Sequence, residues 1–461
     1  MSRFSATLFA GKRFAVVGLG RNGLPAALAL TAMGAEVLAW DDSPLARAAA
    51  TNLLGGEAIG DPSRSLQHFD ALVLSPGIPH LRPTPHPIAV WAHARDLPIL
   101  SDVELLFHAV RASGSGARFA GITGTNGKST TTALLAHILS TAGVTHAAGG
   151  NLGPAALALP LLGDNGVYVI EMSSYMLERI AALRFDVAAM LNLSADHLDR
   201  HQNMAGYAMA KRAIFGRQGA TDLAVIGTDD ADSRTMADAL RRHPMAVATI
   251  SGSHKADIWC EQGVLRDRTG PILRMADAPA LPGAHNAQNA AAASAMALHL
   301  GVAREDIARA IASFPGLAHR QQHVGSRAGI AFVNDSKATN AAAAARAFAC
   351  YPNFVWIAGG IAKEGGIEPL APWFQHVAHA VLIGRDAPIL AATLDVHTIP
   401  YTFAGTLDAA VPAAFAAARA LGATTVLLSP ACASFDQFAG FEARGERFAE
   451  LVAGLAIQGA S

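Results

Sequence analysis

The stretch that decides the fold reads Gly-Ile-Thr-Gly-Thr-Asn-Gly-Lys-Ser-Thr at residues 121–130. It follows a short apolar run and precedes a helical one, so we expect a strand, a glycine-rich turn and a helix in succession. In that geometry, main-chain N–H groups and the helix N-terminus converge on phosphate oxygens. Lys128 would reach the β- and γ-phosphates, and the Ser129 hydroxyl would ligate Mg²⁺. The stretch therefore predicts a site for a nucleoside triphosphate.

This loop is a variant of the general P-loop pattern. That pattern places a glycine five residues before Gly127, where this chain has Ile122, and the glycines of this chain stand at 121 and 124 instead. A flexible glycine turn between a strand and a helix is the alternative interpretation. The Gly-Lys-Ser-Thr run that opens the helix favours phosphate binding over that alternative.

The amino-acid composition limits which kinds of molecule the protein is expected to bind. The chain has 461 residues and a net charge of −1 without blocks of like charge, which argues against nucleic acid and an anionic membrane surface. Its apolar stretches all fall short of the roughly 20 residues of a membrane-spanning helix. The 3 cysteines lie far apart and match no zinc or disulfide pattern, so a cytoplasmic location fits. Lysine is rare among the 35 basic residues, and four lysines fall in segments that other signals single out (Lys128, Lys211, Lys337, Lys363).

Alternating apolar strands and helical segments predict an α/β protein of three domains. Residues 1–107 are expected to form a Rossmann-like domain, and residues 108–315 a central domain of the P-loop ATPase type. Residues 316–461 are expected to form a second Rossmann-like domain with a mostly parallel sheet. A joint rich in serine and glycine at 112–116, which we expect to be flexible, leads into the P-loop strand, and Pro315-Gly316 marks the second boundary.

The first domain carries a dinucleotide-binding fingerprint. Residues 18–23 read Gly-Leu-Gly-Arg-Asn-Gly after a strand at 13–17, and a second strand ends at Asp41-Asp42, where an acid would hold a ribose hydroxyl. Read alone, the fingerprint predicts an NAD-dependent enzyme, and a tight turn needed only for packing is the alternative. A further strand runs into Ser75-Pro76-Gly77, a natural loop for phosphate. The motif predicts a nucleotide-like diphosphate ligand and leaves its identity open.

The central domain delivers polar residues at the ends of expected strands. Glu171 ends a buried strand at 167–170, and a carboxylate there is placed to hold Mg²⁺ or simply to cap the strand. A second strand at 188–193 precedes His197, which by itself is more often structural. Lys211 lies on a helix and by itself would be read as solvated. Asn286 and Asn289 share one helix face at i, i+3, where they would read an adenine edge or cap the helix.

The third domain repeats this pattern. Polar clusters at 334–340, 359–363 and 429–436 each follow an expected strand. Each cluster alone is compatible with a helix cap. Because the carboxyl ends of parallel strands meet at one edge of the sheet, the three together favour a ligand crevice.

With these three domains in this order, the chain resembles the Mur ligase family over essentially its whole length. The loop at 121–130 looks like that family's own P-loop variant. The stretches at 316–320, 334–340 and 429–438 are most similar to members that attach D-glutamate to UDP-N-acetylmuramoyl-L-alanine. The resemblance implies an ATP-dependent amide ligase of cytoplasmic peptidoglycan precursor synthesis that works through an acyl phosphate. These two small molecules would be its partners, and the enzyme is expected to be a monomer.

The resemblance also implies a set of site residues. The first domain would bind the UDP-substrate rather than NAD, through Gly20, Arg21, Asn22, Asp41, Asp42, Ser75, Pro76, Gly77 and Asn151. ATP would contact Gly124, Thr125, Asn126, Gly127, Lys128, Ser129, Thr130, Asn286, Asn289, Arg320 and Asp335. The incoming glutamate would meet Thr339, Lys363, Ser434, Phe435 and Phe441, with Lys363 pairing a carboxylate.

The implied metal set comprises Ser129, Glu171, His197 and Lys211, which would hold two Mg²⁺ ions with Lys211 as a carbamate. An amine that has added CO₂ is an anion and can ligate a metal. An arginine side chain cannot form such an anion. Catalytic roles would fall to Lys128, Lys211 and His197, with His197 orienting groups or binding metal rather than acting as a general base.

Two departures and three alternatives remain open. Family members often carry an acidic residue where this chain has Ile361 and a glutamine where it has Met176, which leaves the preference for D- or L-glutamate undecided. A sibling such as folylpolyglutamate synthase shares the core, although the fingerprint domain argues against it. An NAD-dependent dehydrogenase leaves the P-loop unexplained. A non-catalytic nucleotide sensor would not need the magnesium set and the amino-acid pocket together.

Overall fold

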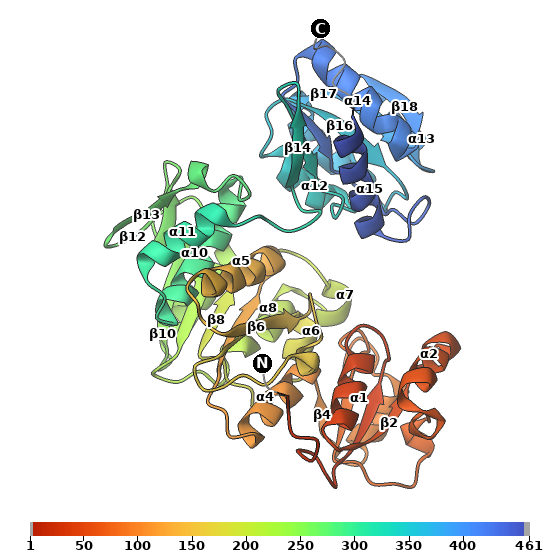
Figure 1. Ribbon diagram of the computed structural model, residues 1–461, viewed down its shortest axis with the longest axis vertical. Coiled ribbons are helices and arrows are strands. Elements are labelled where there is room, and N and C mark those ends of the chain that lie inside the picture. Colours follow the sequence, from red (N-terminus) through yellow and green to blue (C-terminus); the bar gives the residue numbers. More distant parts are fainter. Residues whose placement is uncertain (1–2, 456–461) are drawn as a thin grey trace. The chain divides into compact units, whose positions relative to one another are not determined.

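The computed structural model describes residues 3–455, and the chain forms two compact units. The first unit extends to Pro279 and continues over Ala284–Phe314, and the second comprises Ala280–Gly283 and the chain from Pro315. The first unit contains two β-sheets and the second contains one, each flanked by helices (Figure 1). The predicted α/β class is confirmed.

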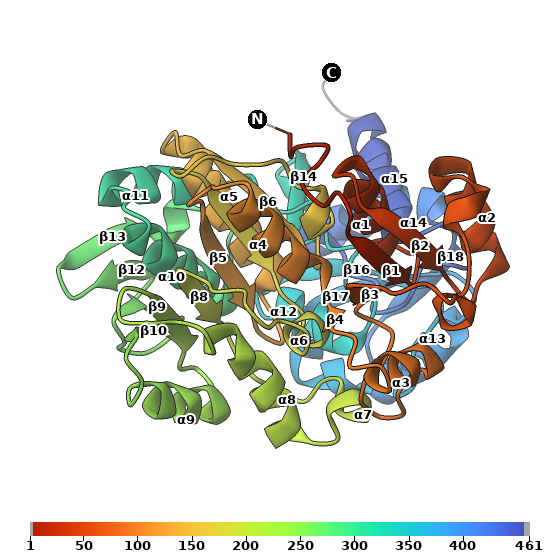
Figure 2. The same ribbon diagram turned by 90° about the horizontal axis from the view of Figure 1, so that it is seen from below.

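A four-stranded parallel sheet in the order β2-β1-β3-β4 begins the first unit. Its elements are β1 (Arg13–Val17), α1 (Gly23–Ala32), β2 (Glu36–Trp40), α2 (Pro44–Leu54), β3 (Ala71–Leu74), α3 (Pro87–His93) and β4 (Ile99–Leu100). Successive strand residues point to opposite faces. Phe14 and Val16 therefore join the core that contains α1 residues, whereas Ala15 and Val17 join the core that contains α3 residues. Helices α1 and α3 are labelled near β1 in Figure 2.

The second sheet has nine strands in the order β13-β12-β11-β10-β9-β8-β5-β7-β6. The strands are β5 (Arg118–Thr123), β6 (His146–Gly150), β7 (Val167–Glu171), β8 (Val187–Met190), β9 (Leu223–Gly227), β10 (Ala246–Ser251), β11 (Ile258–Glu261), β12 (Val264–Asp267) and β13 (Gly270–Arg274). The strands from β6 to β11 pair in parallel, and β12 and β13 extend the sheet as antiparallel strands. Because β5 lies between β7 and β8, the P-loop emerges at the same edge as the carboxyl ends of both neighbours.

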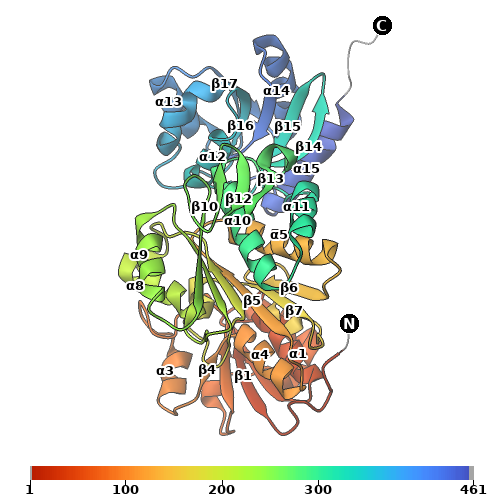
Figure 3. The ribbon, with the colours of Figure 1, turned by 90° about the vertical axis from the view of Figure 1, so that its left-hand side faces the viewer.

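Eight α-helices of the first unit accompany this sheet: α4 (Asp102–Ala112), α5 (Lys128–Thr141), α6 (Ser174–Leu177), α7 (Leu198–His201), α8 (Met204–Arg212), α9 (Ala231–Leu240), α10 (Ala284–His299) and α11 (Arg304–Ser313). Helices α5, α10 and α11 pack side by side (Figure 3). The expected boundary at 107 falls inside α4, whose Val103 and Val110 share one core cluster with Phe119 of β5. The division into three domains stays a prediction.

The turn at residues 112–116 is tied down by hydrogen bonds. Arg111 donates to the carbonyl oxygens of Ser115 and Ala117 at 2.8 and 3.0 Å, and the Ser115 hydroxyl donates to the carbonyl of Leu162 at 2.7 Å. The sequence predicts a flexible joint here; the structure shows these three hydrogen bonds across the turn, and the flexibility stays a prediction.

The second unit is built on a six-stranded sheet in the order β14-β15-β19-β16-β17-β18, in which only the β14–β15 pair is antiparallel among the described strands. Its elements are β14 (Gln322–Arg327), β15 (Ile330–Asn334), α12 (Ala341–Phe348), β16 (Phe354–Gly359), β17 (Val377–Ile383), α13 (Ala387–Val396), β18 (Tyr401–Gly405), α14 (Leu407–Leu421), β19 (Thr425–Leu428) and α15 (Phe441–Gly454). Helices α12 and α13 contribute to the core on one face, and α14 and α15 to the core on the other.

One predicted strand is shorter than expected. The strand predicted over 188–193 ends at Met190 as β8, because the next residues turn toward the P-loop. There the Leu191 N–H donates to the Thr123 carbonyl at 3.0 Å, and the Asn192 carbonyl accepts from the Thr125 N–H at 2.9 Å. None of the described helices is both long and apolar enough to cross a lipid bilayer.

Candidate active site

The P-loop joins β5 to α5 through two glycines in conformations that other residues rarely adopt. Gly124 has φ +148° and Gly127 has φ +83°. A Cβ atom on Gly127 would lie 2.2 Å from the Asn289 Oδ1 atom, so the loop and helix α10 approach each other closely only because this residue is glycine. The strand, turn and helix predicted here are all present.

The two predicted adenine-reading asparagines are buried behind this loop. Asn289 accepts a hydrogen bond from the Thr131 hydroxyl of α5 at 3.2 Å, and its amide donates to the Asn286 Oδ1 atom at 3.1 Å. Both side chains are buried. The structure therefore gives them a role in holding α5 against α10, and their contact with ATP stays a prediction.

Lys128 and Lys211 both turn toward the P-loop backbone. The Lys128 ammonium donates to the carbonyl oxygens of Gly124 and Thr125 at 2.9 and 3.0 Å. The Lys211 Nζ atom lies 2.8 Å from the Gly124 carbonyl and 4.7 Å from the centre of the Tyr207 ring. Lys211 is only 1 % exposed, so it is not the solvated lysine that its helix alone would predict.

Burial changes the chemistry of Lys211. Desolvation first, and then the charge of Lys128, lower the pKa of Lys211 well below its usual value, while Asp196 and Glu171 act in the opposite direction. An amine with a lowered pKa is more often unprotonated and is then a nucleophile. Such an amine is suited to add CO₂ and form a carbamate.

Glu171 ends β7 with one of its oxygens unused among the described residues. Its Oε1 atom accepts a hydrogen bond from the Asn151 amide at 2.7 Å, whereas its Oε2 atom is buried and has no hydrogen-bond partner there. The side chain is 1 % exposed. A buried carboxylate oxygen without a partner is costly, and a divalent cation would satisfy it. This orphaned oxygen fits the Mg²⁺ role predicted for Glu171.

His197 is the N-cap residue of helix α7 and has a left-handed conformation, φ +53°. Its Nδ1 atom lies 2.9 Å from the Tyr175 hydroxyl, and its Nε2 atom lies 3.5 Å from an Asp196 carboxylate oxygen. Within residues 3–455, no group of three histidine, cysteine, aspartate or glutamate side chains is gathered that could hold a metal ion. The set Ser129, Glu171, His197 and Lys211 therefore stays a prediction.

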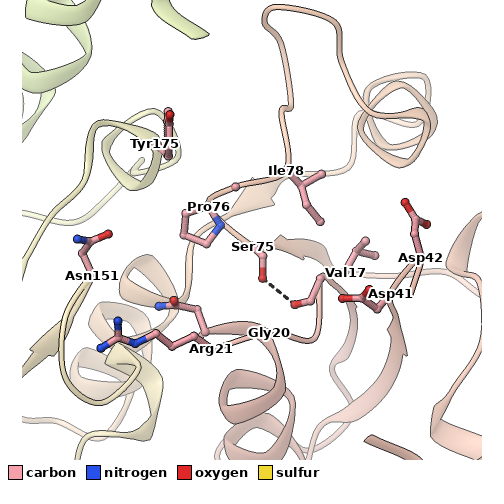
Figure 4. Close-up of a pocket in the computed structure, with 13 residues that line it drawn as sticks. Val17, Gly20, Arg21, Asp41, Asp42, Ser75, Pro76, Ile78, Asn151 and Tyr175 are labelled. Carbon is pink, nitrogen blue, oxygen red and sulfur yellow. Dashed lines mark hydrogen bonds between the residues drawn. The ribbon is translucent and has the colours of Figure 1, made fainter. Parts of the chain in front are cut away.

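A cavity of about 620 Å³ lies in the first unit between the fingerprint loop and β6 (Figure 4). It is lined by Val17, Gly18, Gly20, Arg21, Asn22, Asp41, Asp42, Ser75, Pro76, Gly77, Ile78, Asn151 and Tyr175. Every residue predicted for the UDP-substrate is among them. The structure thus brings these predicted residues together from four separate stretches of the sequence.

Two fingerprint glycines allow close backbone contacts at this cavity. A Cβ on Gly23 would lie 1.8 Å from the Gly18 carbonyl oxygen. A Cβ on Gly18 would lie 2.6 Å from the Cβ atom of Ser75. The Ser75 hydroxyl donates to the same Gly18 carbonyl at 2.6 Å. Gly20 also lines the cavity, and a Cβ built on it would meet nothing within 4 Å.

The acids after β2 are already engaged. The Asp41 carboxylate accepts from the backbone N–H groups of Leu19 and Ser43 at 2.6 and 2.8 Å. Asp42 lies 3.0 Å from the His86 ring nitrogen, a hydrogen bond that lowers the pKa of Asp42. Asp41 therefore fixes the fingerprint loop itself, which weakens the reading of this acid as the ribose ligand of an NAD site.

Sequence reasoning missed two residues beside the cavity. Tyr175 lines it and connects it to His197 through the hydrogen bond given above. Asp102 is buried and accepts hydrogen bonds from the Asn22 amide at 3.2 Å and the Ala156 N–H at 3.0 Å. Both residues lack a local motif, and Asp102 acts through contacts far along the chain.

A second cavity, of about 360 Å³, borders the P-loop. It is lined by Asn126, Asn192, Leu193, Ser194, Asp229, Asp230, Gly252, Ser253, Ala284, His285 and Gln288. Asn192 connects it to the loop, because its Oδ1 atom accepts from the Asn126 N–H at 2.9 Å and its amide donates to Gln288 at 3.2 Å. The lining is rich in amides and carboxylates, which suit a polar ligand.

In the second unit, Asp335 is held at the end of β15. It accepts from the Ser429 hydroxyl at 2.7 Å and from the Gln321 N–H at 3.2 Å. Burial raises the pKa of Asp335 to about 7. Arg320, the other ATP contact predicted in this unit, acts on Asp335 electrostatically and opposes that rise.

The residues predicted for glutamate lie on the loops that follow β15, β16 and β19 and at the start of α15. Ser434 is buried, whereas the Phe435 side chain is 72 % exposed. The Lys337 Nζ atom lies 4.0 Å from the centre of the Phe441 ring. Lys363 is exposed and Thr339 is half-buried.

The chain is similar to known proteins in sequence and in fold. The family model described as Mur ligase middle domain matches residues 122–297. Curated relatives that carry the name UDP-N-acetylmuramoylalanine–D-glutamate ligase are similar over nearly their whole length. The relative from Paramagnetospirillum magneticum is 49 % identical, with 97 % of this chain and 98 % of the relative covered. The relative from Caulobacter vibrioides is 46 % identical, with 98 % of each covered.

Solved structures share the fold at lower sequence identity. UDP-N-acetylmuramate–alanine ligase from Thermotoga maritima matches with a TM-score of 0.59 and 19 % identity, over 96 % of this chain and 99 % of that one. A UDP-N-acetylmuramoylalanyl-D-glutamyl-2,6-diaminopimelate–D-alanyl-D-alanyl ligase from Acinetobacter baumannii matches with a TM-score of 0.56 and 19 % identity, over 76 % and 79 %.

Proposed function

This chain belongs to the Mur ligase family, and we propose that it is the ATP-dependent ligase that adds D-glutamate to UDP-N-acetylmuramoyl-L-alanine. The observation that carries the proposal is an identity of 44–49 % with curated ligases of that name across nearly the whole of both chains. The reaction makes a peptidoglycan precursor in the cytoplasm, and the enzyme works as a monomer.

The UDP part of the substrate occupies the 620 Å³ cavity. Open backbone at Gly20 and the loop at Ser75–Gly77 suit a diphosphate, and Arg21 adds a positive charge at the rim. Asn151 lines this cavity, and its amide donates a hydrogen bond to Glu171. That bond supports a path from the UDP site to the phosphate-binding loop, along which the L-alanyl carboxylate reaches ATP.

ATP binds with its phosphates on residues 124–130. Mg²⁺ would be held by Ser129, Glu171, His197 and Lys211 as a carbamate, and it would neutralise phosphate charge when bound. The orphaned Glu171 oxygen and the lowered pKa of Lys211 support this set. The ATP contacts predicted at Asn286, Asn289, Arg320 and Asp335 stand as part of the same proposal.

The chemistry has two steps. An oxygen of the L-alanyl carboxylate attacks the γ-phosphorus of ATP, the bond to the β,γ-bridging oxygen breaks, and ADP leaves an acyl phosphate behind. The nitrogen of D-glutamate then attacks the acyl carbon, and the tetrahedral intermediate loses a proton and inorganic phosphate to give the amide. Lys128 offsets charge on the phosphates, and Thr339, Lys363, Ser434, Phe435 and Phe441 hold the glutamate.

The test is release of phosphate from ATP with UDP-N-acetylmuramoyl-L-alanine and D-glutamate, L-glutamate or neither. We expect release that requires both substrates and that is faster with D-glutamate. Preference for L-glutamate would keep the reaction but overturn the assigned stereochemistry and direct attention to Ile361. Absence of release with either amino acid would overturn the proposal, and a change in nicotinamide absorbance would point to the dehydrogenase instead.

A further inference from the structure

Two arginines are buried almost completely at loops of the candidate sites. Arg179 is 3 % exposed and Arg444 is 1 % exposed. Neither belongs to the residues predicted to touch a substrate. In the part of the chain that the structure describes, the hydrogen-bond partners of both guanidinium groups are uncharged, and most are main-chain carbonyl oxygens.

Arg179 follows α6 and reaches the loop after β3 that forms a wall of the 620 Å³ cavity. Its Nη1 atom donates to the carbonyls of Leu74 at 2.5 Å and Ser75 at 3.0 Å. Its Nη2 atom donates to the carbonyls of Pro76 at 3.4 Å and Ile78. The carbonyl at the end of β3 and three carbonyls of the loop that follows thus accept hydrogen bonds from one side chain.

This arrangement decides which way the loop's donors face. In a trans peptide the C=O and the following N–H point in opposite directions. The Pro76 carbonyl faces Arg179, so the Gly77 N–H points to the other side of the loop. The neighbouring N–H groups are used, because Ser75 donates to the Val17 carbonyl and Ile78 to the Ser75 carbonyl. Gly77 lines the cavity, and its N–H is placed as a donor to a diphosphate oxygen.

Arg444 of α15 does the same for three loops of the second unit. Its guanidinium donates to the Ser336 hydroxyl at 2.9 Å and to the Ser336 carbonyl at 2.8 Å. It also donates to the carbonyls of Cys432 at 3.2 Å and Gly359 at 3.4 Å. The Ser336 and Cys432 carbonyls belong to the segments after β15 and β19, and Gly359 is the last residue of β16; the segments after these three strands carry residues predicted for glutamate.

Arginine is suited to this task and lysine is not. Burying a cation without a carboxylate partner is unfavourable, and desolvation lowers the pKa of both arginines to about 10. The planar guanidinium presents five N–H donors in a fixed fork, so one side chain satisfies several carbonyls that diverge from different loops. A lysine ammonium presents its three donors at a single atom.

We propose that Arg179 and Arg444 are positioning residues, each of which holds the backbone of one substrate's loops: Arg179 for the UDP moiety and Arg444 for the incoming glutamate. The inference rests on the proposed function and extends it to residues that touch neither substrate. It requires that each of the two arginines affects the binding of a different substrate.

The test compares Arg179→Met and Arg444→Met in steady-state ligation, because methionine keeps much of the buried volume but donates no hydrogen bond. Arg179→Met is expected to raise the KM for UDP-N-acetylmuramoyl-L-alanine about tenfold and to leave the KM for D-glutamate within about twofold. Arg444→Met is expected to raise the KM for D-glutamate about tenfold with the KM for the UDP-substrate nearly unchanged. Arg179→Lys and Arg444→Lys should each give an intermediate value for the same substrate.

Arg304 is the control. It donates to the carbonyls of Gly270 at 2.6 Å and Pro271 at 3.0 Å, which lie on a hairpin at the opposite edge of the nine-stranded sheet from β6, and unlike the other two arginines it also pairs with the Asp267 carboxylate. Arg304→Met should lower the melting temperature and leave both KM values unchanged. The proposal is overturned if the other two methionine variants behave like Arg304→Met, or if each raises both KM values equally.

Two further measurements keep the outcomes separate. If a methionine variant fails to fold, the lysine variant at the same position is measured instead. An unchanged KM in that lysine variant, together with a lowered melting temperature, would overturn the positioning role. Loss of ligation by the wild-type protein would defeat the proposed function itself. Normal wild-type ligation with no substrate-specific effect in the variants would defeat only the inference.

Discussion

The side chains of Lys128 and Lys211 donate to the same carbonyl oxygen, that of Gly124, at 2.9 and 2.8 Å. Two ammonium groups that share one acceptor repel each other, and the charge of Lys128 is one cause of the lowered pKa of Lys211. Converting Lys211 to an anionic carbamate would replace this repulsion by attraction. The pair therefore links the two lysines for which we propose phosphate binding (Lys128) and carbamate formation (Lys211).

The first prediction concerns Lys211 itself. Lys211→Arg keeps a positive charge but cannot add CO₂, so we expect kcat to fall at least about a hundredfold, as for loss of a principal electrostatic group. In the wild type, removing bicarbonate from the buffer should lower turnover, and ¹³C-bicarbonate should give a carbamate signal by NMR that is lost in the variant. Full activity of Lys211→Arg would contradict the carbamate.

The second prediction concerns the unpaired oxygen of Glu171. Glu171→Gln keeps the side chain's shape and an oxygen that can accept from Asn151, but removes the negative charge. We expect the half-saturating Mg²⁺ concentration for ligation to rise about tenfold or more, because hard cations prefer carboxylate oxygen. The exposed Glu36→Gln serves as the control and should leave the Mg²⁺ dependence unchanged. An unaltered Mg²⁺ titration in Glu171→Gln would remove this residue from the metal set.

The third prediction concerns the fingerprint turn. Gly23→Ala would place a Cβ 1.8 Å from the Gly18 carbonyl oxygen, so the turn must shift. We expect a loss of about 1–3 kcal/mol in the free energy of unfolding, typical of overpacking, together with weaker binding of the UDP-substrate by calorimetry. Gly56→Ala is the control, because its Cβ meets nothing within 4 Å. Equal stability of the two variants would show that the turn tolerates a side chain.

The fourth prediction concerns pH and His80, which receives a hydrogen bond from the Arg179 Nε atom at 3.3 Å. Burial, followed by the charge of Arg179, lowers the pKa of His80 from 6.5 to about 3. Between these values the unfolded chain binds the proton and the folded one does not, so His80 makes stability fall as pH falls from 6.5 toward 3.

The measurement is urea unfolding at several pH values within that window. His80→Gln keeps an acceptor for Arg179 but does not titrate. The free energy of unfolding of this variant should therefore fall less steeply with decreasing pH than that of the wild type, and the two slopes should differ by up to about 1.4 kcal/mol per pH unit. An identical slope in the wild type and the variant would show that the folded His80 still takes up a proton there.

Local sequence was sufficient for much of the fold and of one site. The P-loop strand, turn and helix follow from residues 118–141, where glycine spacing and apolar periodicity both act over a few residues. The residues predicted for the UDP-substrate line one cavity because parallel strands end at a common edge. The assignment of this cavity to UDP rests on family resemblance, since the fingerprint read alone predicts an NAD-dependent enzyme.

Other features depend on contacts that local sequence does not encode. The burial of Lys211 is set by the P-loop more than eighty residues earlier in the chain, so its helix alone gave the wrong environment. The same holds for Asp41, whose carboxylate is engaged by the Leu19 N–H. Arg179 and Arg444 look like ordinary surface cations in the sequence, and only the fold shows which carbonyls surround them.

The hydrogen bonds from Arg179 to the loop after β3 are formed within the protein itself. Forming them during folding restricts the conformational freedom of that loop. Binding to a rigid, preformed surface avoids the ordering cost that weakens association with a mobile loop. It also makes the affinity for the UDP moiety depend on the stability of the fold, so conditions that loosen the first unit should weaken substrate binding before they unfold the protein.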